Sequence, residues 1–170
     1  LAGTGWEETT LFAVFMARDR NAFLEALIDV NLQLAGRAAA QVLASETQYL
    51  AMPNTEDRQT LAPELVARIQ RLLLSRMSEP KADLRARVAA GKALGELGDP
   101  RFMGGTAGGR FEFLIPLAIR IPDGTYVVGC NEGIHNHEGR QHSVRLAGFH
   151  IAQFPVTNAE WDCFMRAGGY

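Results

Sequence analysis

The sequence predicts an α+β protein in which a helical segment is followed by a strand-rich one. Before about residue 99, apolar residues recur at steps of three and four, which is the spacing of helices with one buried face. From Phe111 the pattern changes to short apolar runs separated by turns, which is typical of strands. We therefore expect two unlike folding units that meet around the glycines after Pro100.

Five helices are expected in the first segment. Thr4 and Glu7 form a capping box before the first helix, and a turn at residues 19–21 separates it from the second. Asn31 can cap a third helix, whose small apolar side chains suit close packing against other helices. Residues 46–59 are rich in turn-forming residues and are expected to form a connecting loop.

The fourth and fifth helices complete this segment. Pro63 is tolerated in the first turn of the fourth, because no helical hydrogen bond needs an N–H there, and Gly98 ends the fifth. Because short loops join the helices, the sequence predicts an α-helical bundle or a short α-solenoid over residues 1–100. The residues expected to face its core are Trp6, Thr10, Ala13, Val14, Ala17, Phe23, Leu24, Leu27, Ile28, Leu34, Ala35, Ala38, Ala39, Val42, Leu43, Leu61, Leu65, Ile69, Leu72, Leu73, Met77, Leu84, Val88, Leu94 and Leu97.

Residues 101–115 are expected to form a Gly-rich linker. Glycines can bring backbone N–H groups together around a phosphate, but the phosphate-loop motif ends in Gly-Lys followed by Ser or Thr, which this stretch lacks. A flexible connection is therefore the preferred interpretation.

Strands and one helix are expected in the remaining residues. The runs 117–121 and 126–129 flank a Pro-Asp-Gly turn, which predicts a hairpin. Two further strands are expected at 143–146 and 149–152. A capping box at residues 157–160 opens a final helix.

Composition and charge exclude several classes of protein. The net charge of −2 provides no basic field for a nucleic-acid backbone, and no apolar run approaches the roughly 20 residues that cross a bilayer. Cys130 and Cys163 are too few for a disulfide framework, so free thiols are expected. Because the first residues lack the pattern of a secretory signal, we expect a cytoplasmic protein.

One local cluster has the chemistry of metal ligands. His135, His137, Glu138 and His142 offer imidazoles and a carboxylate, which together can share a cation such as zinc. The alternative is a polar surface loop between two strands, since this spacing is not the fixed helical spacing of specific zinc motifs. From the sequence we assign no metal ligand, no cofactor-binding residue and no catalytic residue.

The other aromatic and reactive side chains have structural interpretations. Trp6 and Trp161 stand at apolar helix positions and are expected in the core. Glu7 and Glu8 diverge around the helix, so the preference of a first turn for acidic residues explains them. Cys163 lies in a predicted helix and is expected to be buried and unreactive.

The end of the helical segment has a resemblance to a known repeat family. Residues 87–102, which close with Gly98-Asp99-Pro100, look like the last helix of HEAT-like repeats. Residues 5–27 resemble a helical part of prokaryotic NACHT-type signalling ATPases, in which such repeats often occur. The resemblance implies a HEAT-like region over residues 1–100 within a larger signalling or defence protein.

Residues 116–170 resemble the opening of formylglycine-generating domains, the sulfatase-modifying-factor family. The motifs that agree in order are Ile121-Pro122-Asp123-Gly124-Thr125-Tyr126, Gly129, residues 140–146, Gly148-Phe149-His150-Ile151, residues 154–161, Phe164 and Gly168-Gly169-Tyr170. The resemblance implies the start of a C-type-lectin-like α/β domain, incomplete here. In catalytic members the copper-binding cysteine pair lies later in the domain, and Cys130 and Cys163 do not match its positions.

These resemblances lead to two hypotheses on function. The first is a recognition or scaffold segment of a multidomain prokaryotic signalling or defence protein, which binds a protein or peptide, or the remainder of its own domain after Tyr170. Exposed strand edges also favour oligomers. The alternative is an oxidoreductase of the formylglycine-generating class, which acts on a peptide cysteine with copper and oxygen.

Overall fold

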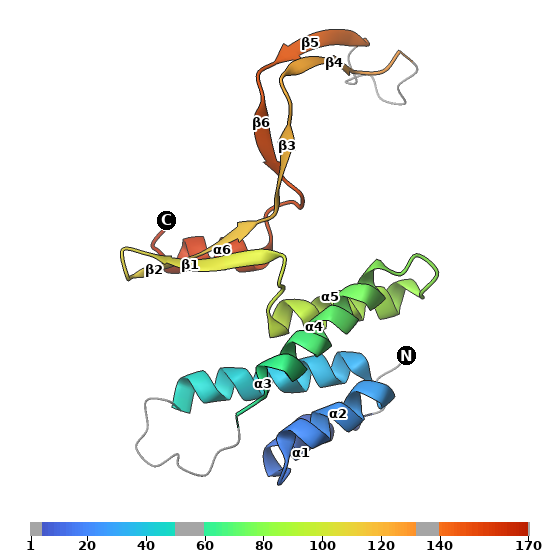
Figure 1. Ribbon diagram of the computed structural model, residues 1–170, viewed down its shortest axis with the longest axis vertical. Coiled ribbons are helices and arrows are strands. Elements are labelled where there is room, and N and C mark those ends of the chain that lie inside the picture. Colours follow the sequence, from blue (N-terminus) through green and yellow to red (C-terminus); the bar gives the residue numbers. More distant parts are fainter. Residues whose placement is uncertain (1–4, 50–59, 132–139, 170) are drawn as a thin grey trace. The chain divides into compact units, whose positions relative to one another are not determined.

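The computed structural model describes residues 5–49, 60–131 and 140–169, and the chain divides into two compact units at Pro100. The first unit, residues 1–100, is helical, and the second, residues 101–170, contains paired strands and a helix (Figure 1). Helix and sheet are thus both present, in agreement with the α+β class that the sequence predicts.

Hydrogen-bonding side chains mark where the helices of the first unit begin. The Asp19 carboxylate accepts a hydrogen bond from the backbone N–H of Ala22 at 3.0 Å, and Asn31 Oδ1 accepts one from Leu34 at 3.1 Å. Asp83 accepts two from the next helix, at 3.0 and 3.2 Å. Such caps satisfy N–H groups that lack a partner in the first helical turn. The helices are α1 (Glu7–Met16), α2 (Arg20–Val30), α3 (Leu32–Tyr49), α4 (Pro63–Ser78) and α5 (Leu84–Leu97).

The ends of these helices agree with the sequence patterns at most points. Pro63 is the first residue of α4, and Gly98 follows α5 with a φ of 97°, which favours glycine. One expectation is wrong: α3 continues through residues 46–49, which were expected to begin the connecting loop. The expected cap at Thr4 and the rest of the expected loop, residues 50–59, lie outside the described residues.

The core of the first unit forms around the small-residue face of α3. Ala35, Ala38, Ala39 and Val42 are fully buried there, as expected. At Gly36 a Cβ atom would lie 2.7 Å from Leu73 Cδ1 of α4 and 3.3 Å from Ala93 Cβ of α5. Glycine therefore allows α3 to approach both neighbouring helices closely.

The expected inward faces of α1 and α5 are partly wrong. α1 buries Leu11 and Val14, whereas Trp6 is 69% exposed. α5 buries Ala90, Ala93, Leu94 and Leu97, whereas Leu84 and Val88 are exposed. The face of α5 that packs against α3 is the one with alanines, because only small side chains fit the short distance between these two helices. The other expected core residues of the described helices are buried or partly buried, except Leu72.

Residues 101–115 form most of a β-hairpin instead of the expected linker. β1 (Phe102–Ala107) pairs antiparallel with β2 (Phe111–Pro116). Gly108 and Gly109 have φ values of 61° and 67°, and Arg110 N donates to Ala107 O at 3.2 Å. Two successive residues with positive φ make the type of turn that matches the twist of a hairpin, which explains the glycines there.

The remaining strands form a long two-stranded ribbon. β3 (Ala118–Ile121) pairs with β6 (Phe149–Ala152), and β4 (Gly124–Val128) pairs with β5 (His142–Leu146), all antiparallel. The expected hairpin between β3 and β4 is therefore wrong, because β3 and β4 follow one another along the same side of the ribbon. α6 (Asn158–Arg166) follows the ribbon in sequence.

The ribbon is interrupted where Pro122 and Asp123 lie opposite Ala147 and Gly148. Proline has no N–H to donate to a ladder. A Cβ atom at Gly148 would lie 3.3 Å from Asp123 N and 3.5 Å from Ile121 O, so glycine lets the two backbones approach closely. Figure 1 shows the ribbon bending at this point, between the β3–β6 and β4–β5 segments.

We predict that Gly36→Val lowers the free energy of unfolding of the helical unit by about 1–3 kcal/mol, because the added methyl groups overpack the contact with Leu73 and Ala93. Gly95→Ala is the matched control, since a Cβ atom there meets nothing within 4 Å, and it should stabilise the helix by up to about 1 kcal/mol. Urea denaturation followed by circular dichroism measures both. Equal stability of the two variants would contradict close packing at α3.

Candidate functional site

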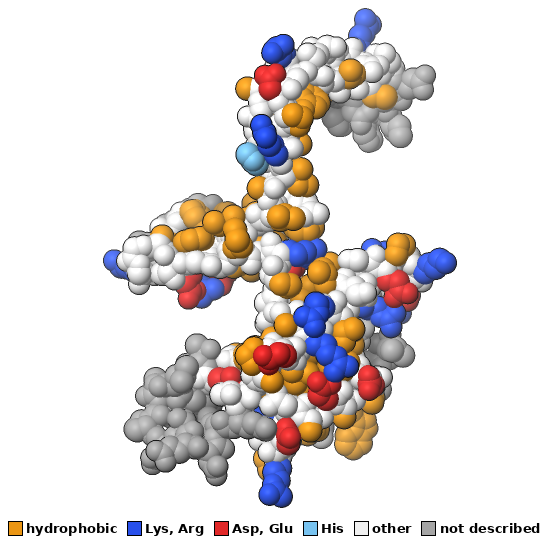
Figure 2. Space-filling model, viewed as in Figure 1, with side chains coloured by type: hydrophobic (Ala, Val, Ile, Leu, Met, Phe, Trp, Pro, Cys, Tyr) orange, Lys and Arg blue, Asp and Glu red, His pale blue; other side chains and the backbone are white. Residues whose placement is uncertain are grey.

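One exposed apolar surface of the second unit lies on the β3–β6 half of the ribbon. Alternate residues of a strand point to opposite faces, and the register pairs Ile119 with Ile151 and Ile121 with Phe149 on one face. We call these four residues the isoleucine face. Ile119, Phe149 and Ile151 are 45%, 41% and 52% exposed. Figure 2 shows hydrophobic side chains exposed along the ribbon.

The opposite face of the same half is polar. There Arg120 pairs with His150, and Ala118 pairs with Ala152. Among the described residues, Arg120 makes no ion pair with a carboxylate. The β3–β6 half of the ribbon is therefore amphipathic, with a cationic group in the middle of its polar face.

The apolar side changes face in the other half of the ribbon. In the β3–β6 half the odd-numbered positions are apolar, whereas in the β4–β5 half most apolar residues stand at even-numbered positions, namely Tyr126, Val128, Val144 and Leu146, with Val127 as the exception. The change happens across the interruption at Pro122. Tyr126 Oη donates to Pro122 O at 2.8 Å, and Arg145 pairs with Asp123 at 3.3 Å, so both contacts hold the bend.

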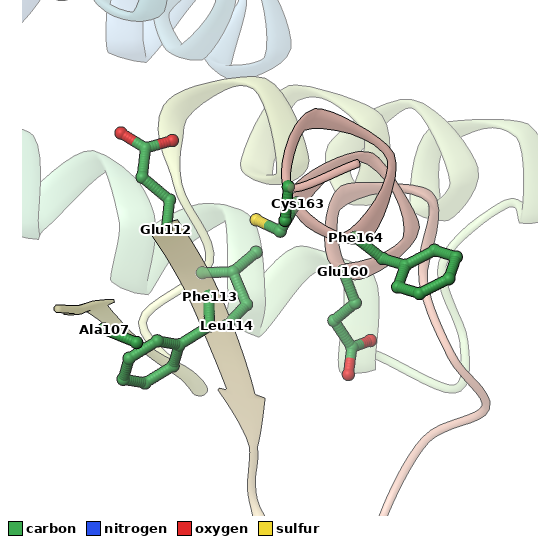
Figure 3. Close-up of a pocket in the computed structure, with 8 residues that line it drawn as sticks. Ala107, Glu112, Phe113, Leu114, Glu160, Cys163 and Phe164 are labelled. Atoms are coloured by element: carbon green, nitrogen blue, oxygen red, sulfur yellow. The ribbon is translucent and has the colours of Figure 1, made fainter. Parts of the chain in front are cut away.

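A cavity of about 290 Å³ lies between the β1–β2 hairpin and α6. Figure 3 shows the Cys163 thiol of α6 pointing toward β2. The residues that line the cavity are Ala107, Glu112, Phe113, Leu114, Glu160, Cys163, Phe164 and Ala167. Most of them are apolar, so the cavity suits an apolar group.

Two sets of polar contacts position α6 beside this cavity. A capping box joins Thr157 and Glu160, with Thr157 N donating to Glu160 Oε2 at 2.7 Å and Glu160 N donating to Thr157 Oγ1 at 3.3 Å. At the other end Arg166 pairs with Asp162 at 2.6 Å and with Glu112 of β2 at 3.2 Å. The hydrogen bond and the charge of Asp162 raise the pKa of the Arg166 guanidinium, which stays charged.

The described residues do not fit the copper site that the formylglycine-generating resemblance implies. A copper site of that kind needs two thiolates together, and Cys163 is the only thiol that lines the cavity. Cys130 follows β4 and is exposed, and both cysteines are free. The expectations of free thiols and of a buried Cys163 are confirmed.

Three members of the candidate metal cluster, His135, His137 and Glu138, lie outside the described residues. The fourth, His142, begins β5, and its Nδ1 is 2.9 Å from Arg140 O, an arrangement in which the ring donates to the carbonyl. Within residues 5–49, 60–131 and 140–169, no group of three or more metal-ligating side chains occurs. The metal hypothesis therefore has no support from the part of the chain that the structure describes.

The two tryptophans are not core residues in the described structure, contrary to the expectation. Trp6 precedes α1, and Trp161 lies on the exposed side of α6 with its ring 5.2 Å from that of Phe164. The face of α6 toward the hairpin is occupied by Cys163, which explains why Trp161 points elsewhere. Glu8 pairs with Arg37 at 3.8 Å, which gives this acidic residue a structural role.

A second, larger groove of about 860 Å³ occurs in the first unit, lined by residues of α1, α3 and α5 and the segments that precede α3 and α5. Three cationic and three anionic side chains line it, and Arg37 is paired there with Glu96 at 3.6 Å. Because the charges are balanced, the groove offers no dominant field for a charged ligand.

None of the described helices is both long enough and apolar enough to cross a membrane.

We predict that Thr157→Ala lowers the free energy needed for local opening of α6 by about 1 kcal/mol, because it removes the capping box. Local opening should then expose the buried Cys163 thiol about fivefold more often. The rate of alkylation of Cys163 in a Cys130→Ser background measures this, with Thr125→Ala on exposed β4 as the control. An unchanged rate in Thr157→Ala would mean that the cap does not hold the helix in place.

Comparison with known proteins finds a match in the second unit only. No curated protein and no solved structure gives a significant match to the chain. Residues 108–170 match the family model of the sulfatase-modifying factor enzyme 1-like domain. The match begins at the β1–β2 turn, earlier than the resemblance at residues 116–170, and so includes all of β2. The C-terminal part of this chain is therefore similar to a sulfatase-modifying factor enzyme 1-like domain.

Proposed function

We propose that this chain is a recognition and scaffold segment of a multidomain prokaryotic signalling or defence protein that acts in the cytoplasm. In this proposal HEAT-like helices of the first unit support a second unit that opens a lectin-like domain and binds a protein or peptide. The observation that carries the proposal is the isoleucine face, of which Ile119, Phe149 and Ile151 are exposed and Ile121 is half-buried among the described residues.

Physical reasons favour an occupant for this face. An isolated two-stranded ribbon is marginally stable in water and gains stability when its apolar side is covered. Exposed apolar patches on a folded unit are also typical of surfaces that bind other proteins. The opposite, polar face needs no cover, so a partner that lies on the isoleucine face buries apolar area without burying Arg120.

The alternative is an oxidoreductase of the formylglycine-generating class, which the family match at residues 108–170 favours. When bound, copper would activate oxygen for oxidation of a peptide cysteine. The described residues of this chain provide no pair of thiolates for the metal, so no catalytic role is assigned to them here. Incubation of the chain with Cu(I), oxygen and a cysteine peptide, followed by hydrazide labelling of aldehyde product, tests this alternative directly.

The recognition proposal predicts that selection from a displayed random peptide library yields peptides that bind this chain through the isoleucine face. The double variant Ile119→Ser, Ile151→Ser should bind the selected peptides at least about tenfold more weakly, because each substitution removes apolar surface that a bound peptide would cover. Fluorescence anisotropy measures the Kd. Val30→Ser, at an exposed apolar position of α2, is the matched control and should leave the Kd unchanged.

Two outcomes would contradict this proposal. One is that no peptide is enriched over an unrelated protein of similar size. The other is that the double serine variant binds as well as the unsubstituted chain while amide hydrogen exchange in β3 and β6 shows that these two strands are still paired.

A further inference from the structure

The outer edge of β3 is open in the part of the chain that the structure describes. β3 pairs only with β6, in a sheet of two strands, so its other edge carries backbone groups without a strand partner there. An exposed edge of this kind is a template for another extended chain. Ile119 and Ile121 stand on one face of this edge and Arg120 stands on the other.

We propose that the edge of β3 binds an extended peptide segment in which apolar residues alternate with acidic ones. This inference rests on the proposed recognition function and names the chemistry of the partner. The added strand would pair antiparallel or parallel with residues 118–121. Its apolar side chains extend the isoleucine face, and its acidic side chain lies beside Arg120 on the polar face.

Charge complementarity selects an acidic residue for the polar position. Arginine carries its charge at every physiological pH, and opposite charges on neighbouring strands stabilise a sheet while like charges oppose pairing. The cross-strand neighbour of Arg120 is His150, which supplies no negative charge. An acidic residue on an added strand therefore provides what the described residues do not, whereas a basic residue would be repelled.

The interruption at Pro122 limits the length of this site. Proline cannot donate a hydrogen bond to an added strand, so the edge ends after Ile121. The next residue, Asp123, is already paired with Arg145 at 3.3 Å and presents a carboxylate that repels a further acidic side chain. The edge thus suits a short segment of about four residues.

The test compares two fluorescent peptides, TVEVEVT and TVKVKVT, with the full chain. The acidic peptide should bind about fivefold more tightly to the unchanged chain, and Arg120→Glu should reverse this preference. Arg85→Glu, an exposed residue of α5 with the same change of charge, should leave the preference unchanged. N-methylation of alternate residues in TVEVEVT should abolish binding, because it removes the N–H donors of the added strand.

Several results would overturn the inference. The inference is wrong if the two peptides bind with equal affinity, or if the N-methylated peptide still binds tightly. It is also wrong if Arg120→Glu has no effect on the preference, or if Arg85→Glu has the same effect. A stable dimer by light scattering that neither peptide disrupts would assign the edge to a second copy of the chain instead. If library-selected peptides bind the isoleucine face without alternation and without dependence on Arg120, only this inference fails; if no peptide binds at all, the proposed function fails with it.

Discussion

The close approach of two backbones at Gly148 is the contact on which the ribbon depends. Pro122 interrupts the ladder, and a Cβ atom at position 148 of the facing strand would lie 3.3 Å from Asp123 N, so glycine fits this close approach without displacing the backbone. The pairing therefore resumes in the same register beyond the break. Because the apolar positions change parity there, one ribbon presents apolar side chains on opposite faces of its two halves. The bend allows these faces to meet different surroundings.

The two units differ in how completely they bury their apolar residues. The first unit closes its core around the alanines of α3, with Ile69 and Leu73 of α4 fully buried. In the second unit, Cys163 is the only hydrophobic residue counted as buried among those the structure describes. Burial of apolar area is the main favourable term in folding, so the second unit has the stronger physical need for an occupant. This contrast is the basis of the proposed recognition function.

The candidate site was predicted only in part from the sequence. The capping box at Thr157 and the buried Cys163 were predicted, because helical periodicity and caps involve residues a few positions apart. The isoleucine face was missed, since it depends on the pairing of Ile119 with Ile151, which lie far apart in sequence. The alternation of Ile119, Arg120 and Ile121 was the one local signal that pointed to an amphipathic strand.

The sequence by itself determined the helical unit, the caps at Asn31 and Thr157, the glycine that ends α5 and the family resemblance of the C-terminal part, because each of these depends on neighbouring residues or on the order of short motifs. Only the tertiary structure decided that residues 101–115 form a hairpin, that β3 pairs with β6 instead of β4, and that alanines of α5 face α3. The physical reason is that strand partners and helix faces are selected by packing between distant segments, and local propensity does not encode which segments meet.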